Sequence, residues 1–232
     1  MGTLSYLGAR LLDYISDMAY ILPVMLISFT LHECSHGYVA YKLGDPTAKN
    51  EGRLTLNPLK HIDPIGFITM ILIHFGWAKP VPVNPLYFKN PKKGMMLTAA
   101  AGPASNLLLA AVSSAFSVFF SYAYLYSGGS SVIRIIFMFF FYLTLINIGL
   151  AVFNLIPVYP LDGSRILGYF MPDGFNDFFR RYGQYIYVIF IVLLLATDFI
   201  GSAVYAVQST LYRGFEFLWH VPAEFAARLI FG

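Results

Sequence analysis

The chain has 232 residues, of which 58% are hydrophobic and only 12% are charged, and its formal net charge is +3. A soluble domain carries about twice that charged fraction, so the composition argues against a soluble protein. The net charge is modest and no basic tract is interleaved with aromatic residues, which argues against a nucleic-acid partner. The apolar stretches are long enough to cross hydrocarbon. We therefore expect a single all-α, polytopic membrane domain over residues 1–232.

Four apolar segments are predicted to span the bilayer as helices, and the two ends of the chain are predicted to lie at its interface. The spans are residues 18–42, 95–126, 132–156 and 183–207, and the interfacial segments are 1–17 and 208–232. The second span begins with AAAGPASN (99–106), whose small residues let neighbouring helices approach closely. The pattern predicts a helix bundle.

The loop between the first two spans, residues 43–94, is rich in Pro, Gly and Asn. Within it, RLTLN (53–57) alternates polar and apolar residues, which predicts a short strand. The run WAKPVPVNP (77–85) must be extended, because prolines at that density exclude a helix. Residues 66–75 are apolar but too few to span, which indicates a re-entrant or interfacial piece. We expect a small β or extended re-entrant element after the first span.

The distribution of Lys and Arg predicts the orientation in the membrane. Eight of them lie within residues 42–93 and three within 158–182, whereas the short loop joining the second and third spans has none. Positively charged loops stay on the cytoplasmic side. Both charged loops are therefore expected in the cytoplasm.

The first predicted span contains HECSH (32–36), an HExxH sequence. Residues four apart lie on one face of a helix, so His32 and His36 can both reach one metal ion. Glu33 is rotated by about 100°, close enough to contact a metal-bound water without being a ligand. Cys34 points to the opposite face and is excluded as a ligand. The motif predicts a zinc hydrolase site.

Two histidines in a membrane helix have another reading. Ionisable groups in a span are costly and are usually functional, but an imidazole pair can also bond neighbouring helices or relay protons. The motif alone leaves this alternative open.

Asp162 is the candidate for a third protein ligand, which catalytic zinc usually requires. It lies in NLIPVYPLDG (154–163), just past the third span and on the cytoplasmic side by the charge argument. The two histidines lie roughly 20 Å into the first span, also in the cytoplasmic half. Pro157 and Pro160 break the helix and could turn Asp162 back toward the metal. An ordinary Asp-Gly turn is the alternative.

HExxH on a spanning helix, a long loop, GPxxN (102–106) and then NLIPVYPLDG together resemble the site-2 protease family. The resemblance covers about residues 18–170, because these motifs match in order and spacing. WAKPVPVNP and LNPLKHIDPIG (56–66) are similar to short prokaryotic members. PDZ-type and CBS-type insertions, which some members carry, are not evident in the sequence.

The resemblance implies roles for individual residues and a location. His32, His36 and Asp162 would hold one Zn²⁺, and Glu33 would be the catalytic base. Asn154 would contact the substrate backbone or the developing oxyanion. The protein would be a multi-pass protein of a prokaryotic plasma membrane, with its active site facing the cytoplasm.

The resulting prediction is a zinc metalloendopeptidase that cuts a peptide bond within or near a transmembrane segment of a membrane protein, at the cytoplasmic side of the bilayer. The alternatives are a proton- or metal-ion transporter that uses the same cluster, and a catalytically silent membrane scaffold. Several transporter folds have two matching halves with broken helices, and the chain shows no such repeat.

Three secondary expectations concern substrate binding and a loop histidine. An unwound substrate could pair with an exposed strand edge, first at residues 53–57 and second at 77–83. Asn106 is expected to pack, to cap or, as a weaker candidate, to touch substrate or the oxyanion. His61 is expected to be solvated, and the alternatives are a role behind the metal ligands or as a spare metal ligand.

Overall fold

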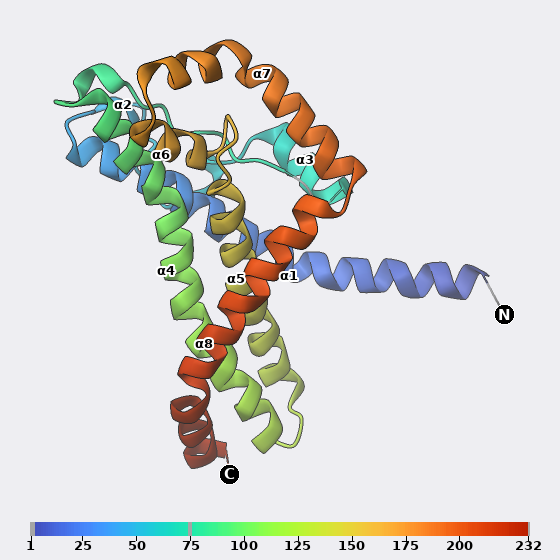
Figure 1. Ribbon diagram of the computed structural model, residues 1–232. Coiled ribbons are helices and arrows are strands. Elements are labelled where there is room, and N and C mark those ends of the chain that lie inside the picture. Colours follow the sequence, from blue (N-terminus) through green and yellow to red (C-terminus); the bar gives the residue numbers. More distant parts are fainter. Residues whose placement is uncertain (1–2, 74–75, 232) are drawn as a thin grey trace.

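The computed structural model describes residues 3–73 and 76–231, and within these ranges it is helical with no β-strand (Figure 1). The long helices are α1 (Thr3–Lys42), α4 (Pro91–Tyr126), α5 (Ser131–Asn154), α7 (Asp173–Ala196) and α8 (Phe199–Phe231). The short ones are α2 (Thr47–Asn50), α3 (Pro64–Ile73) and α6 (Asp162–Phe170), with 3-10 turns at Pro58–Lys60 and Pro85–Tyr87.

Helix α4 lies at the centre of the bundle and packs against α1, α5, α6 and α8. Its buried face consists largely of small residues, including Ala99, Gly102, Ala110, Ser113 and Ser117. Small side chains let helix backbones approach closely, which is how helices associate in a membrane. The predicted packing role of this segment agrees with the structure.

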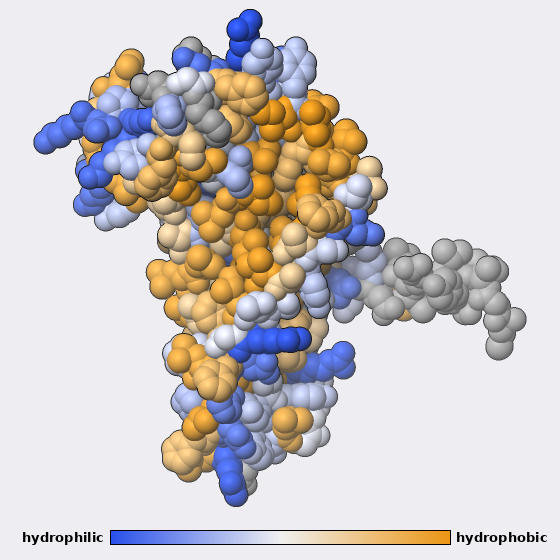
Figure 2. All heavy atoms as spheres, in the orientation of Figure 1, coloured by the Kyte–Doolittle hydropathy of each residue, from blue (hydrophilic) through white to orange (hydrophobic). Residues whose placement is uncertain are grey.

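In the part of the chain that the structure describes, three helices are long and apolar enough to span a membrane: α1 from Tyr14, α4 and α5. Figure 2 shows hydrophobic residues over the middle of the bundle and hydrophilic ones toward its upper left and its lower end. The prediction of an all-α polytopic membrane protein is confirmed. In Figure 1, the first turns of α1 project away from the bundle, continuous with the rest of that helix.

The fourth predicted span, 183–207, is not one straight helix. It is interrupted between Ala196 and Phe199, and the flanking helices α7 and α8 meet at a bend of 78°. Thr197 adopts an extended conformation (φ −137°, ψ 151°), and its hydroxyl donates to the Leu193 carbonyl at 2.6 Å. Such local side-chain bonds compete with helix continuation. Taken together, the bent pair gives up to four spans.

The strand predicted at residues 53–57 is wrong. These residues form bends without strand pairing. Their polar groups bond locally instead: Arg53 N–H donates to Ala48 O at 2.8 Å, and the Thr55 carbonyl accepts from His61 Nε2 at 2.8 Å. The only β-type pairing in the described part of the chain is an antiparallel bridge between Ile62 and Ala78.

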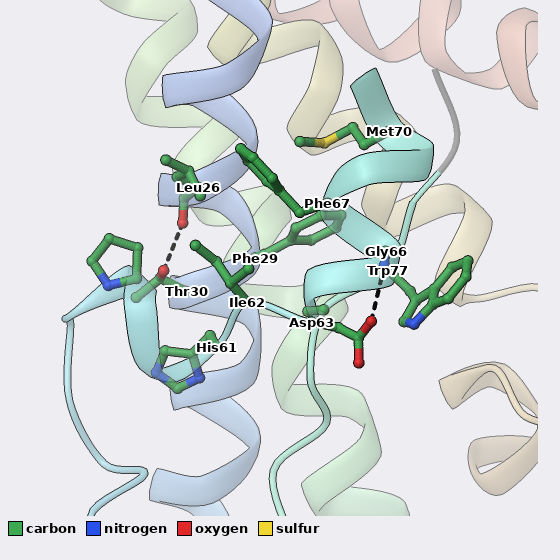
Figure 3. A pocket seen from close by; sticks show the side chains of 12 residues that line it. Leu26, Phe29, Thr30, His61, Ile62, Asp63, Gly66, Phe67, Met70 and Trp77 are labelled. Atoms are coloured by element: carbon green, nitrogen blue, oxygen red, sulfur yellow. Dashed lines mark hydrogen bonds between the residues drawn. The ribbon is translucent and has the colours of Figure 1, made fainter. Parts of the chain in front are cut away.

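The second extended candidate, residues 77–83, runs against the beginning of α3 (Figure 3). Asp63 Oδ1 accepts from the Gly66 N–H at 2.9 Å, which caps α3. A Cβ on Gly66 would lie 2.9 Å from the Trp77 nitrogen, so glycine permits this backbone contact. The loop between α1 and α4 is thereby folded onto itself, and it contacts Glu33 at Val81 before it continues to α4.

Candidate metal centre and active site

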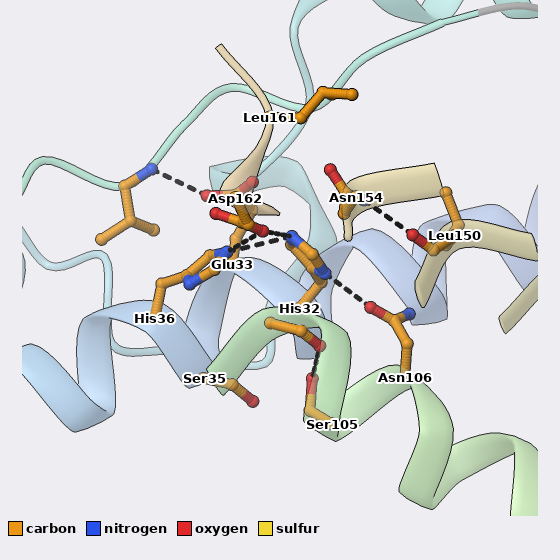
Figure 4. A network of polar contacts seen from close by, with 12 residues as sticks. His32, Glu33, Ser35, His36, Ser105, Asn106, Leu150, Asn154, Leu161 and Asp162 are labelled. Atoms are coloured by element: carbon orange, nitrogen blue, oxygen red, sulfur yellow. Dashed lines mark hydrogen bonds and ion pairs between the residues drawn. The ribbon is translucent and has the colours of Figure 1, made fainter. Parts of the chain in front are cut away.

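Helix α1 presents His32 and His36 on one buried face, as the HExxH spacing requires. These residues are 7% and 9% exposed, and their Nε2 atoms lie 3.0 Å apart. Asp162 Oδ2 lies 3.3 Å from His32 Nε2 and 3.2 Å from His36 Nε2 (Figure 4). The structure therefore brings together the three residues that the sequence proposed as ligands.

The arrangement of these three atoms fits a tetrahedral zinc ion. Ligands about 2.0–2.1 Å from a tetrahedral ion lie about 3.3 Å from one another, which is the spacing found here. Two imidazoles and a carboxylate are also a donor set that catalytic zinc uses. The triangle of donor atoms needs no side-chain rearrangement to take the ion.

The charge state of Asp162 suits metal binding. Burial raises the pKa of this carboxyl, but the hydrogen bonds and positive charge of His32 and His36 outweigh burial and lower its pKa to about 2. The carboxylate is thus ionised at neutral pH, as a ligand must be.

The chain turn after α5 delivers Asp162 to the site. Asp162 is the first residue of α6, and Gly163 follows it. A Cβ on Gly163 would lie 2.6 Å from Ile156 O and would collide with Leu155 O. The Asp-Gly pair is required because only glycine lets the start of α6 fold onto the backbone at the end of α5.

Gly102 of α4 lies directly against the two imidazoles. A Cβ at this position would stand 2.5 Å from His32 Cε1 and would also collide with His36 Nε2. The glycine in GPxxN therefore makes room for the metal ligands. Sequence reasoning assigned this segment to helix packing and missed its contact with the site.

The far side of each imidazole is held by α4. His32 Nδ1 donates to Asn106 Oδ1 at 2.5 Å, and His36 Nδ1 donates to the Thr98 carbonyl at 2.7 Å. With Nδ1 protonated, Nε2 carries the lone pair that a metal needs. The Asn106 amide is fully buried behind His32, which favours an orienting role over the predicted contact with substrate.

Glu33 faces the same cavity as the metal ligands, next to the loop at residues 77–83. Its Oε2 accepts a hydrogen bond from the Val81 N–H at 2.8 Å. Pro80 and Val81 line the cavity together with Glu33 and Asp162. A backbone donor thus fixes the carboxylate of the predicted base. This contact could not be anticipated, because a main-chain N–H leaves no mark in the sequence.

Asn154 is the last residue of α5 and lines the same cavity. Its amide Nδ2 donates to Leu150 O at 2.9 Å within its own helix. Figure 4 shows Asn154 beside Asp162, and its contact with the substrate backbone or the developing oxyanion stays a prediction. The cavity also reaches Arg165 of α6, which brings a positive charge to its edge.

Comparison with known proteins decides the family. YwhC of Bacillus subtilis, described by its name as a zinc metalloprotease, is 41% identical over 191 residues, which cover 80% of this chain and 85% of YwhC. The family model for peptidase family M50 matches residues 123–197. The chain belongs to peptidase family M50, the site-2 protease family.

More distant relatives carry similar names. Zinc metalloprotease MJ0392 of Methanocaldococcus jannaschii is 30% identical over 166 residues, covering 69% of this chain and 37% of that protein. Rip2 of Mycolicibacterium smegmatis, also named as a zinc metalloprotease, is 28% identical over 178 residues, covering 72% and 64%. No solved structure matches the chain.

Family membership gives the coarse function. The M50 chain is a zinc metalloprotease, and the predicted cofactor, Zn²⁺, agrees with the cluster of His32, His36 and Asp162, whose ligand atoms all lie within 4.8 Å of one another. A protease family favours hydrolysis over the ion-transport alternative.

Proposed function

We propose that this protease cleaves a peptide bond within or near a transmembrane segment of a membrane protein, at the cytoplasmic side of a prokaryotic plasma membrane. The observation that carries the proposal is the position of the donor triangle: His32 and His36 project from α1, one of the three helices able to span a bilayer. A metal site built on a spanning helix implies a substrate that is itself in the membrane.

The chemistry follows from the side chains around the cavity. A zinc ion held by His32, His36 and Asp162 would supply Lewis acidity and lower the pKa of a bound water. Glu33 accepts a proton from the attacking water and passes it to the leaving amine. The Val81 N–H holds the Glu33 carboxylate in place for both transfers. Asn154 is positioned to bind the substrate backbone or the oxyanion.

A groove next to the active-site cavity supports entry of the substrate from the bilayer. A groove of about 390 Å³ lies between α1, α5, α7 and α8. It shares Phe29, Leu150 and Phe153 with a cavity of about 210 Å³ that is lined by His32 and Glu33. The groove wall is mostly apolar, as expected for a path that accepts an apolar peptide.

Residues 77–83 are the better candidate for holding an unwound substrate, now that 53–57 has proved not to be a strand. The segment is extended, and Pro80, Val81 and Val83 line the cavity at the metal ligands. A peptide lying between this segment and the zinc site would pair with its carbonyl oxygens, because Pro80 and Pro82 have no N–H and the Val81 N–H already bonds Glu33. Pairing along such an edge supplies backbone hydrogen bonds independent of substrate sequence.

The main test compares the wild-type protein with Glu33→Gln. Both are purified, their zinc content is measured, and each is assayed on a model membrane-spanning peptide in liposomes. We expect about one zinc per chain in both proteins and cleavage only by the wild type. Ion flux through the liposomes without proteolysis would contradict the proposal and support a transporter.

The orientation has its own test. In a Cys34→Ser background, the exposed residues Lys60 and Ser131 are replaced singly by cysteine. A membrane-impermeant thiol reagent should reach Lys60→Cys from the cytoplasmic side and Ser131→Cys from the opposite side. The reverse labelling pattern would show that the active site does not face the cytoplasm.

A further inference from the structure

A chain of buried polar side chains connects three helices to the metal ligand His32. His32 Nδ1 bonds Asn106 Oδ1 at 2.5 Å, and Asn106 Nδ2 donates to Asn147 Oδ1 at 2.6 Å. Asn147 Nδ2 in turn donates to Ser28 Oγ at 2.8 Å. Asn106, Asn147 and Ser28 are all fully buried. These residues of α4, α5 and α1 do not line the active-site cavity, so their purpose needs another explanation.

Two backbone carbonyls fix the direction of every hydrogen bond in this chain. A carbonyl only accepts, so Ser28 must donate to Val24 O, at 2.7 Å, and keeps its lone pairs for Asn147. Leu143 O, at 2.8 Å, likewise requires the nitrogen of the Asn147 amide. The Asn147 oxygen must then face Asn106.

The same logic continues to the metal site. Because Asn147 presents its oxygen, Asn106 must present its nitrogen there and its oxygen to His32. An amide oxygen only accepts, so His32 must carry its proton on Nδ1. The other ring nitrogen, Nε2, is then left with a lone pair toward Asp162 and His36.

We propose that Asn147 is a positioning residue for the zinc site. Through Asn106 it determines which ring nitrogen of His32 carries the proton. Asn147 itself lies on α5, a helix that supplies no metal ligand. The inference rests on the proposed zinc site. Without Asn147, the Asn106 amide is free to turn its NH₂ group toward His32, which would place the imidazole proton on Nε2, where the metal binds. Groups that orient metal ligands typically contribute 10- to 100-fold to metal affinity.

The test is a cycle of four proteins: wild type, Asn147→Leu, Asn106→Asp and the double variant. Zinc affinity is measured by competition with a chelator, independently of cleavage. We expect Asn147→Leu to weaken zinc binding roughly tenfold in the wild-type background. In the Asn106→Asp background, Asn147→Leu should not weaken zinc binding. The aspartate has no NH₂ group that could turn toward His32 Nδ1.

A purely structural role gives a different result. If Asn147 only packs the helices, Asn147→Leu weakens zinc binding equally in both backgrounds, and the proposal is overturned. Ser113→Ala is the matched control: Ser113 Oγ and Thr144 Oγ1 form another buried contact between α4 and α5, at 3.0 Å, and its loss should leave zinc affinity unchanged. If the leucine variant does not fold, Asn147→Ala replaces it in both backgrounds.

The outcomes also separate this inference from the proposed function. A wild-type protein that binds no zinc overturns both. A wild-type protein that binds zinc, with an Asn147→Leu variant of equal affinity, overturns the role of Asn147 alone and leaves the protease proposal intact.

Discussion

The main-chain N–H of Val81 donates a hydrogen bond to Glu33 Oε2 at 2.8 Å, so a loop residue holds the side chain that follows the first metal ligand. Val81 lies between Pro80 and Pro82, neither of which has an N–H to offer. Val81 is therefore the only one of these three consecutive residues that can donate a main-chain hydrogen bond. If the loop shifted by one residue, a proline would face Glu33 and the hydrogen bond would be lost.

Val81→Pro removes this donor. Hydrogen bonds to charged groups are worth about 1.5–3 kcal/mol, so cleavage should fall at least about tenfold in kcat while zinc content stays the same. Val81→Ala retains the N–H and should lose much less activity. Equal activity of Val81→Pro and Val81→Ala in the liposome assay would show that the hydrogen bond does not serve catalysis.

Gly102→Ala should disrupt the metal centre without touching a ligand. The new Cβ would stand 2.5 Å from His32 Cε1, closer than atoms approach without displacement, so the imidazoles must shift. We expect at least a tenfold loss of zinc affinity, measured by chelator competition. Gly214→Ala on α8 meets nothing within 4 Å and serves as the control. Unchanged zinc affinity in Gly102→Ala would contradict the close approach of α4 to the ligands.

The sequence was sufficient to predict that His32, His36 and Asp162 meet, because few arrangements of side chains suit a zinc ion. HExxH spacing places two imidazoles on one helix face, and the prolines before Asp162 indicated a turn back toward them. Gly163 explains why that turn is possible, since a side chain there would collide with the end of α5. The contribution of backbone groups, such as Thr98 O on His36 Nδ1, could not be predicted because any residue type supplies them.

The loop at residues 43–94 was predicted less well because its polar residues are buried. The alternation in RLTLN was read as a half-exposed strand, yet Arg53 is only 6% exposed. His61, expected to be solvated, is 1% exposed. An alternating pattern indicates a half-exposed strand only when its charged residues face solvent. Here Arg53 Nη2 and His61 Nε2 bond backbone carbonyls, which compensates part of the cost of burying both side chains.

Arg53 should affect catalysis through the loop it holds. Its Nη2 donates to Lys79 O at 2.6 Å, two residues before Val81, and the Lys79 N–H donates to His61 O at 2.8 Å. Arg53→Leu frees this segment, so we expect a several-fold loss of cleavage with zinc content unchanged. Lys60→Leu changes an exposed charge of the same loop and is the control. Loss of zinc from Arg53→Leu would instead indicate general misfolding.

The groove between α5 and α8 should be required for membrane-embedded substrates only. Gly149 lines it, and a Cβ there would meet just the end of the Gln208 side chain at 3.4 Å, so a larger residue can be accommodated while it fills the groove. Gly149→Leu should therefore slow cleavage of a membrane-spanning peptide at least tenfold. It should leave zinc binding and cleavage of a short soluble peptide unchanged, because the metal centre lies beyond the groove.

The control is Gly214→Leu, which adds the same volume on α8, outside the groove, and should slow cleavage of neither substrate. Equal losses on both substrates in Gly149→Leu would place the entry route elsewhere.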